Sequence, residues 1–333
     1  MASAFHGATV GMLLAACAAC APQVQLYGPA EGPPRLESGA LVTPDGRRLP
    51  YAAWSETEPK AVVVALHGFN DYRTAFEAPA KWLAARGVVT YAYDQRGFGE
   101  APERGIWAGG QAMAEDAKAF VRIAAARHPG LPVYLMGDSM GCAVALLALA
   151  DRDAPEVAGA VLVAPAVWGG KAMNPAFRFG IWFAAHTTPW NYATGQGLRR
   201  VPSDNDEMLR KLGRDPLVIK QTRIDAVYGL TQLMGEAQDA APQVRVPLLV
   251  LYGDRDEIVP AGPIAELVAE LKAPRRYVRY GQGYHMLLRD LQAETVWRDV
   301  AVWLADRSAP LPSGEERGPG RSVLAGDPPP PVR

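Results

Sequence analysis

A serine lies between two glycines in the segment Gly137-Asp138-Ser139-Met140-Gly141. An apolar run typical of a strand precedes this segment, and a helix-forming run follows it. A sharp turn from strand to helix pushes the hydroxyl at its centre outwards, and flanking glycines let the backbone pass without Cβ clashes. The start of the following helix also favours negative charge near that hydroxyl. We therefore predict Ser139 to be a nucleophile.

A serine hydroxyl is a weak nucleophile and needs a base, which is usually a histidine. The chain has five histidines. His285 follows the last predicted strand, so it would lie at the same sheet edge as the serine. His67 directly follows the first buried strand, where a base would be unusual, and His186 in a long insertion is kept as an alternative. His285 is predicted as the base, because His6 falls in an N-terminal leader and His128 at the opposite sheet edge.

Three carboxylates follow the penultimate predicted strand: Asp254, Asp256 and Glu257. One of them could hold the tautomer of the histidine. Asp254 stands beside Gly253, where an aspartate commonly caps a turn, whereas Asp256 lies further along the loop. The residues alone leave Asp254 and Asp256 open. The chain order serine, acid, histidine differs from that of chymotrypsin-like and subtilisin-like enzymes.

Short apolar runs alternate with helix-length amphipathic runs along most of the chain. Continuous rather than alternating apolar runs indicate a parallel sheet that helices cover on both faces. Ligands in such sheets bind beyond the carboxyl ends of the strands. A hairpin is predicted around Pro44-Asp45-Gly46. The predicted strands are 61–66, 88–93, 132–136, 160–164, 247–252 and 276–280, and the predicted helices are 75–86, 111–127, 140–150, 262–271 and 288–304.

Five motifs in this order resemble the α/β-hydrolase family, and within it the serine hydrolases similar to monoacylglycerol lipases and lysophospholipases. They are His67–Tyr72, Asp94–Gly99, Gly137–Gly141, Gly253–Pro260 and Gly283–His285. The resemblance implies an α/β-hydrolase fold, with a mostly parallel sheet, helices on both faces and a helical lid insertion. The chain has no Cys-x-x-Cys or His-Glu-x-x-His spacing for a zinc site, and a serine mechanism needs no cofactor and no metal.

The resemblance also implies roles for particular residues. It places the acid at Asp256 rather than Asp254, and it implies an oxyanion hole made by the backbone N–H groups of Phe69 and Met140. His67 would then be a structural residue of the oxyanion turn, and the Asp94–Gly99 motif would support the site without performing chemistry. Related epoxide hydrolases and dehalogenases carry an aspartate at the elbow, so the serine argues against those reactions. It suits esters, thioesters and some amides equally.

Between residues 168 and 244 the chain leaves the strand pattern for longer than a bare crossover needs. The resemblance places a lid here. The first part of this segment carries seven aromatic residues: Trp168, Phe177, Phe179, Trp182, Phe183, Trp190 and Tyr192. These aromatic side chains would either pack the lid onto the body, or line an acyl channel or touch a membrane.

The N-terminal residues 1–16 are predicted to be a signal peptide, because their apolar stretch is too short to span a bilayer. The segment Leu14-Ala15-Ala16-Cys17 resembles the bacterial lipobox, which would make Cys17 the lipid-carrying mature N-terminus. A signal cut near Ala19, giving a soluble periplasmic protein, and a cytosolic chain with a mis-assigned start are the alternatives.

Composition divides the remainder of the chain. Residues 17–38 and 308–333 are rich in Pro and Gly, which predicts a tether and a disordered tail around a catalytic domain at 39–307.

The chain has 333 residues and a net charge of −1, which provides no field to attract a nucleic acid. Three cysteines are too few for a disulfide framework.

Together these features predict an enzyme of the bacterial envelope, anchored by lipid and facing the periplasm. It would cleave a small lipophilic ester, of the monoacylglycerol or lysophospholipid type, through an acyl-enzyme. The alternatives are a serine peptidase or aminopeptidase, a thioesterase, and a scaffold without catalytic activity.

Overall fold

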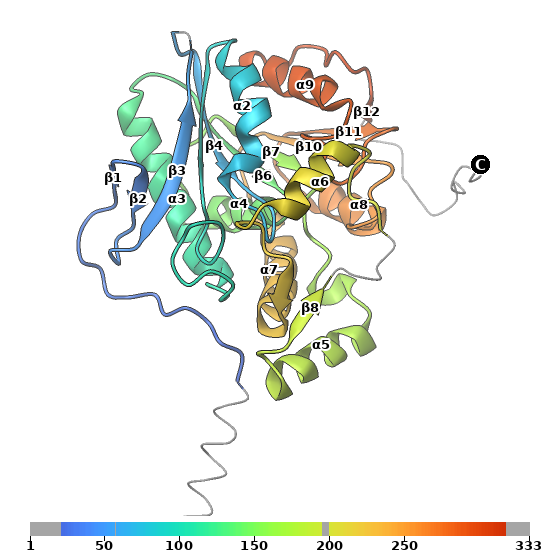
Figure 1. The fold of residues 1–333 in the computed structure, drawn as a ribbon. Coiled ribbons are helices and arrows are strands. Elements are labelled where there is room, and N and C mark those ends of the chain that lie inside the picture. The colour runs from blue at the N-terminus through green and yellow to red at the C-terminus, as the bar shows by residue number, and fades with distance from the viewer. Residues whose placement is uncertain (1–20, 57, 195–199, 318–333) are drawn as a thin grey trace, which may run out of the picture.

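A computed structural model describes residues 21–56, 58–194 and 200–317, and a sheet of ten strands lies at its centre (Figure 1). The strand order is β1-β2-β3-β5-β4-β6-β7-β10-β11-β12. The pairs from β5 to β11 are parallel, and antiparallel strands extend both edges. The bounds are β1 (Arg35–Glu37), β2 (Ala40–Val42), β3 (Arg48–Trp54), β4 (Ala61–Leu66), β5 (Val88–Tyr93), β6 (Val133–Asp138), β7 (Gly159–Val163), β10 (Leu248–Gly253), β11 (Arg275–Tyr280) and β12 (Glu316–Arg317).

The inner strands are buried on both faces, which explains their continuous apolar runs. All six residues of β4 are buried: Val62, Val64 and Leu66 point into one core, and the alternate residues point into the other. Helices α3, α4 and α8 cover the first face, and α2 and α9 cover the second. Their bounds are α2 (Glu77–Ala84), α3 (Gly110–Arg127), α4 (Met140–Ala150), α8 (Ala261–Glu270) and α9 (Ala293–Ala305).

The predicted strands and helices agree with the structure within a few residues, except at the last helix. This helix begins at Ala293 rather than at residue 288. The preceding segment is held in turns, because the Asp290 carboxylate accepts hydrogen bonds from the Tyr284 N–H at 2.8 Å and from the Ser203 hydroxyl at 2.6 Å. These long-range contacts override the helical pattern of the sequence.

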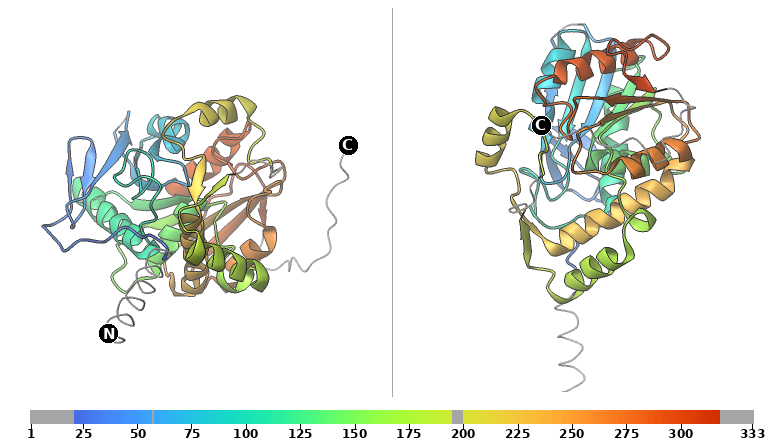
Figure 2. Two further views of the ribbon diagram at one scale, coloured as in Figure 1. Left: turned by 60° about the horizontal axis from the view of Figure 1, so that its bottom comes forward. Right: turned by 90° about the vertical axis from the view of Figure 1, so that its right-hand side faces the viewer.

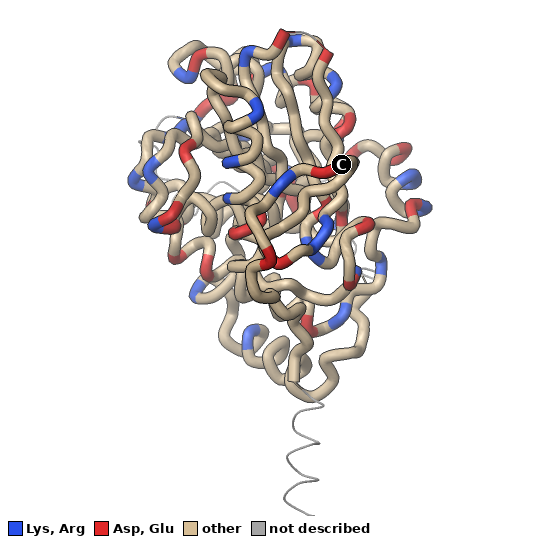
Figure 3. The backbone as a smooth tube through the Cα atoms, turned by 90° about the vertical axis from the view of Figure 1, so that its left-hand side faces the viewer, with Lys and Arg blue, Asp and Glu red and all other residues tan. Residues whose placement is uncertain are grey.

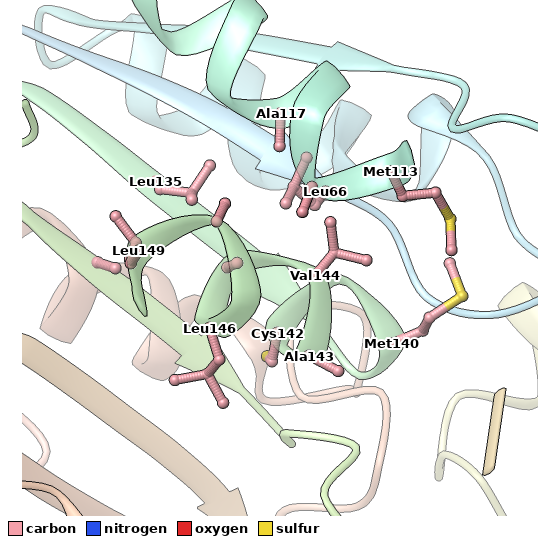
Figure 4. Close-up of a cluster of buried hydrophobic side chains, with 14 of the residues drawn as sticks. Leu66, Met113, Ala117, Leu135, Met140, Cys142, Ala143, Val144, Leu146 and Leu149 are labelled. Carbon is pink, nitrogen blue, oxygen red and sulfur yellow. The ribbon is translucent and has the colours of Figure 1, made fainter. Parts of the chain in front are cut away.

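Helix α4 is buried on nearly all sides. Figure 4 shows Val144 and Leu149 of this helix on the side of Leu135 of β6 and Ala117 of α3, and Leu146 on the opposite side. Burying a Leu or Val side chain stabilises a fold by about 1.5–3 kcal/mol. The helix that follows Ser139 is therefore fixed rigidly to the sheet.

The predicted insertion between β7 and β10 forms a mainly helical layer. Helix α7 packs on α4 through Ala226, Leu233 and Ala237, whereas α5 lies at the outer end of the molecule (Figures 1 and 2). Strands β8 and β9 pair with each other away from the central sheet. The elements are α5 (Pro175–Thr187), β8 (Tyr192–Thr194), α6 (Asp206–Arg214), β9 (Gln221–Arg223) and α7 (Ile224–Ala240), with the short 3-10 helices η2 (Gly170–Ala172) and η3 (Ala241–Gln243). A further 3-10 helix, η1 (Arg73–Phe76), lies outside the insertion and directly precedes α2.

The predicted tether at 17–38 is wrong for its described part. Gln25 is buried, its backbone N–H donates to the Trp107 carbonyl at 2.8 Å, and its amide Nε2 donates to the Ile106 carbonyl at 2.8 Å. Residues 35–37 form β1. The Glu31 N–H also donates to the Pro44 carbonyl at 2.6 Å. Hydrogen bonds to backbone partners thus hold this segment, and such contacts leave no apolar periodicity in the sequence. The predicted signal peptide and Cys17 lie outside the described residues.

The predicted tail also begins too early at Ser308. Leu311 is buried, the Ser313 N–H donates to Asp299 at 2.9 Å, and β12 pairs with β11. The folded body therefore extends to Arg317, because an open sheet edge offers backbone partners that a Pro-rich composition does not reveal. Residues 318–333 lie outside the described part.

The predicted supporting motif at Asp94–Gly99 contains a buried ion cluster. Arg96 is 1% exposed and makes paired hydrogen bonds to Asp45 in the hairpin turn, at 2.7 and 2.8 Å, and to Asp116 on α3, at 2.6 and 2.9 Å. Burial raises the pKa of Asp116 to about 6, although the guanidinium opposes this shift. Arg96 thus joins three segments of the body beneath the site.

No helix in the described part has the length and apolarity to cross a membrane.

Candidate active site

Ser139 occupies a strained turn between β6 and α4, with φ of 52° and ψ of −111°. Such a positive φ is costly for a residue with a side chain and persists only where its surroundings enforce it. A Cβ at Gly137 would lie 2.4 Å from the Cys142 nitrogen, and one at Gly141 would lie 1.9 Å from the Leu66 carbonyl oxygen. Both glycines of the motif are thus required by close backbone approach, as predicted.

The structure brings Ser139, His285 and Asp256 into one hydrogen-bonded chain. His285 Nε2 lies 3.0 Å from Ser139 Oγ, and His285 Nδ1 lies 2.8 Å from Asp256 Oδ2. The other Asp256 oxygen accepts from the backbone N–H groups of Ile258 at 2.7 Å and Val259 at 2.9 Å. The carboxylate is therefore fixed, and the imidazole can take the serine proton.

The competing carboxylate Asp254 points elsewhere. Its Oδ1 accepts from Arg279 Nε at 2.7 Å, in a partly exposed ion pair. The choice between Asp254 and Asp256, which the residues alone left open, is thus decided by geometry in favour of Asp256.

The other described histidines do not reach the serine. His67 is fully buried: its Nδ1 donates to the Gly68 carbonyl, and its Nε2 accepts from the Gln95 N–H at 2.9 Å. Burial lowers the pKa of His67, so the ring is neutral, as suits a structural residue of this turn. His128 pairs with Tyr91, and the alternative base His186 is bonded to the carbonyl one turn back on α5. His6 lies outside the described residues.

Two opposing effects set the basicity of His285. Burial disfavours the charged ring, but the hydrogen bond and the charge of Asp256 outweigh burial and raise the pKa of His285 above its usual value. The Asp138 carboxylate acts in the same direction, and the Arg289 guanidinium acts against it. The imidazolium that forms when the serine loses its proton is thereby stabilised.

The two predicted oxyanion amides lie beside the nucleophile. Met140 is the first residue of α4, where an amide has no partner within its own helix. Gly68, which precedes Phe69, is so close that a Cβ on it would lie 3.5 Å from Ser139 Cβ. The Phe69 ring packs edge-on against Phe98. Phe69 and Met140 therefore belong to the two chain segments that adjoin Ser139, and the oxyanion hole made by their amides stays a prediction.

The sequence did not predict a set of hydrogen bonds that joins the oxyanion turn to the insertion, which we call the latch. Asn70 Nδ2 donates to Thr222 Oγ1 at 2.7 Å, and the Ile219 N–H donates to the Asn70 carbonyl at 3.0 Å. Two residues further on, the Tyr72 hydroxyl donates to Asp215 at 2.6 Å. Asn70 has a φ of 65°, so its conformation needs such support. No signal in the sequence links residues 150 positions apart.

A cavity of about 400 Å³ opens at Ser139 and has two chemically different parts. Its larger wall is apolar and comes mainly from the insertion. Its apolar lining includes Trp168, Met173, Phe177, Val227, Leu230 and Met234. A larger groove of about 640 Å³ lies between α6 and the helices α2 and α9, but none of its lining residues belongs to the hydrogen-bonded chain of Ser139.

The polar part of the cavity contains Asp71, Asp138 and Arg289. Arg289 Nη2 lies 2.7 Å from Asp71 and 3.9 Å from Asp138. Burial raises the pKa of Asp138 to about 6 despite the nearby guanidinium. Both aspartates belong to motifs that the sequence singled out, whereas Arg289 carries no local signal. Across the described ranges, no group of three or more His, Cys, Asp and Glu side chains is placed to hold a metal ion.

Comparisons with known proteins identify the family of this chain and several relatives. The family described as serine aminopeptidase, S33, matches residues 57–292. Human monoglyceride lipase is 27% identical over 276 residues, covering 81% of this chain and 90% of that protein. Monoacylglycerol lipase from Mycolicibacterium smegmatis is 27% identical over 276 residues, covering 78% of this chain and 93% of that protein.

Solved structures support the fold. A soluble variant of monoglyceride lipase from Saccharomyces cerevisiae, in complex with a substrate analog, has a TM-score of 0.69 at 19% identity, covering 86% of this chain and 98% of that one. The α/β-hydrolase fold predicted from the motifs is thus confirmed.

The Asp256→Asn substitution should change both the rate and its pH dependence. Because Asp256 raises the pKa of His285, and because the neutral ring is the base, the acid limb of kcat/KM should move to lower pH. The loss of a correctly held tautomer should lower kcat by about 10³–10⁴-fold. The measurement is a pH–rate profile with a soluble ester.

Asp254→Asn is the matched control, since it removes the same charge from the same loop, and the Asp254 carboxylate accepts from Arg279 and not from His285. It should leave the profile in place. Equal effects of the two substitutions would rule out a specific role for Asp256.

The Thr222→Val substitution should weaken the latch without changing side-chain size. A lost hydrogen bond of about 0.5–1.5 kcal/mol corresponds to a fall in kcat of about 2- to 13-fold, with little change in KM. Affinity for a trifluoromethyl ketone inhibitor, whose tetrahedral adduct uses the oxyanion hole, should fall in parallel.

Thr187→Val serves as the control, because that hydroxyl donates only within α5, to the Phe183 carbonyl at 2.8 Å. A rise in KM with unchanged kcat in Thr222→Val would mean that the latch acts on substrate entry instead.

Proposed function

This chain belongs to the family described as serine aminopeptidase, S33, and we propose that it cleaves esters of lipophilic acyl groups through an acyl-enzyme on Ser139. It is a carboxylic ester hydrolase, as its resemblance to proteins named monoglyceride lipase indicates. The finer part of the proposal concerns the substrate type, a monoacylglycerol or lysophospholipid, and the residues that act on it.

The proposed reaction has two halves. Ser139 Oγ attacks the ester carbonyl while its proton passes to His285 Nε2, and the N–H groups of Phe69 and Met140 hold the oxyanion. Collapse of the tetrahedral intermediate releases the alcohol, which takes the proton from His285. A water then attacks the acyl-enzyme, gives a proton to His285, and the carboxylic acid leaves as Ser139 recovers its proton. Asp256 stays ionised and stabilises the imidazolium in both halves.

The observation that carries the proposal is that the cavity at Ser139 combines a large apolar wall with a cluster of charged side chains, Asp71, Asp138 and Arg289, which we call the polar corner. The apolar wall from the insertion suits an acyl chain. Asp71, Asp138 and Arg289 offer acceptors and donors to a small hydroxylated alcohol or head group. An ester bond placed at Ser139 would thus have its acyl part in the apolar region and its alcohol part in the polar corner.

One feature favours an aminopeptidase as the second candidate. Asp71 and Asp138 are two carboxylates in the cavity wall, and such a pair could bind the α-amino group of a peptide. Arg289 lies 2.7 Å from Asp71, however, and its positive charge offsets the attraction for an amine. The apolar wall also exceeds what a small amino-acid side chain requires, so the ester is preferred.

The Ser139→Ala substitution should abolish hydrolysis of p-nitrophenyl esters, with kcat falling by about 10⁶-fold because the nucleophile is absent. Circular dichroism should be unchanged, since the hydroxyl contributes no packing. Full activity in this variant would exclude the proposed mechanism.

The same preparation would separate the candidate functions. We expect the wild-type enzyme to hydrolyse a long-chain monoacylglycerol with a kcat/KM well above that for an acyl-thioester or an aminoacyl-p-nitroanilide. A preference for the anilide would favour the aminopeptidase. Failure of a fluorophosphonate to label Ser139 would favour a scaffold without catalytic activity.

We further propose that the protein is a lipoprotein of the bacterial envelope, anchored through Cys17 and facing the periplasm. The support is the segment Leu14-Ala15-Ala16-Cys17 after an apolar stretch. A lipid anchor would hold a hydrolase of lipophilic esters close to a membrane that contains them.

The Cys17→Ser substitution tests this proposal. In a bacterial host, radiolabelled palmitate should enter the wild-type protein, and globomycin should block its processing. Palmitate incorporation should be lost in Cys17→Ser, because serine provides no thiol for the thioether. Palmitate-free wild-type protein of the same processed length would instead indicate a soluble periplasmic enzyme.

A further inference from the structure

The described chain begins with a segment that crosses one side of the body in close contact with it. We call residues 23–28 the strap. Figures 1 and 2 show the first described residues running from the end of the molecule where α5 lies toward β1. The family match covers residues 57–292 and does not include the strap, so family membership does not explain its contacts with the body.

Two charged groups of the body hold the ends of the strap. At one end, the Gln23 N–H donates to Asp225 Oδ2 at 3.1 Å. At the other end, the guanidinium carbon of Arg96 lies 4.8 Å from the centroid of the Tyr27 ring, which is a cation–π distance. Asp225 belongs to α7 of the insertion and Arg96 to the buried ion cluster, so the strap connects these two parts of the molecule.

Gln25 attaches the middle of the strap to the loop between β5 and α3. Its side chain is buried, and its backbone N–H and its Nε2 donate to the carbonyls of Trp107 and Ile106, each at 2.8 Å. A Cβ at Gly97 would lie 2.4 Å from the Ile106 carbonyl oxygen and 3.0 Å from Gln25 Nε2. The strap and the loop are thus in close contact, and the Gln25 amide pairs a carbonyl of that loop.

Trp107 extends from this loop to the oxyanion turn. The indole is 5% exposed, and its ring packs edge-on against the Phe69 ring with centroids 6.2 Å apart. A Cβ at Gly229 of α7 would lie 2.4 Å from Trp107 Cδ1, so the indole fills the space between the insertion and the turn. Trp107 therefore supports the residue whose N–H is the predicted oxyanion donor.

The packing around Phe69 couples the turn to the indole. A void of about 10 Å³ is bordered by Phe69, Asn70, Trp107 and Thr222 among others. A single water molecule needs about this much space, so the turn has little room to shift while Trp107 stays in place. Close-packed interiors transmit a displacement instead of absorbing it. The strap, through Trp107, and the latch, through Thr222, thus support the same turn.

The charges beside the strap pair with one another. Arg47 forms an ion pair with Glu103, and its Nη2 also donates to the Leu26 carbonyl at 3.2 Å. Figure 3 views the molecule from the side of β1 and β2 and shows acidic and basic residues interspersed over it. Such a surface offers no field of one sign to a charged partner, which favours an internal role for the strap.

We infer that the strap positions the oxyanion turn, because Gln25 fixes the loop that carries Trp107 and Trp107 holds Phe69. Gln25 and Trp107 are positioning residues, since neither lines the active-site cavity. The inference rests on the proposed function, in which the Phe69 N–H stabilises the tetrahedral intermediate. The intermediate uses this N–H more than the bound substrate does, so loss of the support should act on kcat and not on KM.

The first test compares Gln25→Leu with the wild-type enzyme, both as the full chain, on p-nitrophenyl butyrate. Leucine has a similar size and keeps the backbone N–H, but it cannot donate to the Ile106 carbonyl. We expect kcat to fall about threefold or more with KM unchanged, and affinity for a trifluoromethyl ketone inhibitor to fall by the same factor. The acid limb of the pH–rate profile should stay in place, because the contacts of His285 are intact.

The second test replaces the indole. Trp107→Leu should lower kcat and inhibitor affinity about tenfold or more, and Trp107→Phe should restore most of both, because a phenyl ring keeps the aromatic contact with Phe69. Trp303→Leu is the matched control. Trp303 is also buried, but it packs on Tyr134 in the core on the other face of the sheet, with centroids 5.7 Å apart.

The control should lower the melting temperature as Trp107→Leu does, but leave kcat and inhibitor affinity unchanged. All variants are compared at a temperature where circular dichroism shows them folded. Three results would overturn the inference: wild-type kcat and inhibitor affinity in Gln25→Leu and Trp107→Leu, equal losses of kcat in Trp107→Leu and Trp303→Leu, or a rise in KM alone.

The ketone separates this inference from the proposed function. A wild-type protein that binds the ketone but hydrolyses no ester would count against the proposed function. Lower ketone affinity in Gln25→Leu would still support the strap in that case, and equal affinity would overturn it.

Discussion

The close contact between α4 and β4 is the constraint on which the site depends. Gly141 lies against the Leu66 carbonyl so closely that any side chain would collide with it, and Gly137 lies equally close to the start of α4. This contact forces Ser139 to a positive φ and lifts its hydroxyl above the sheet edge. The apolar packing of α4 on both sides supplies the stabilisation that offsets the strained turn.

Three chain segments that follow separate strands meet at this hydroxyl. The loop after β10 brings Asp256, the loop after β11 brings His285, and the turn after β4 brings Phe69. Because parallel strands end at the same edge, none of these residues needs a special contact to find the others. The buried ion cluster around Arg96 and the hydrogen bonds of His67 fix the turn after β4 and the loop after β5 from below.

The insertion has different inner and outer sides in this arrangement. Its inner side supplies the apolar wall of the cavity and holds the oxyanion turn through Thr222 and Asp215. Its outer side exposes the aromatic rings of α5. Both sides belong to one layer, which α7 anchors to α4, so the apolar wall of the cavity is fixed relative to the nucleophile.

The sequence by itself determined the strand and helix order, the nucleophile elbow and the position of His285, because each leaves a local signal in apolar runs, glycines or strand ends. It left Asp254 and Asp256 open until the family resemblance was considered, and only the folded loop directs Asp254 to Arg279 and Asp256 to His285. Tertiary structure alone decided the Thr222 latch, the Arg289 corner, the ordered ends at 21–38 and 308–317, and the outward direction of the α5 aromatics. These features join residues that are distant in the chain, and a hydrogen bond or an exposed helix face leaves no periodic pattern by which the sequence could reveal it.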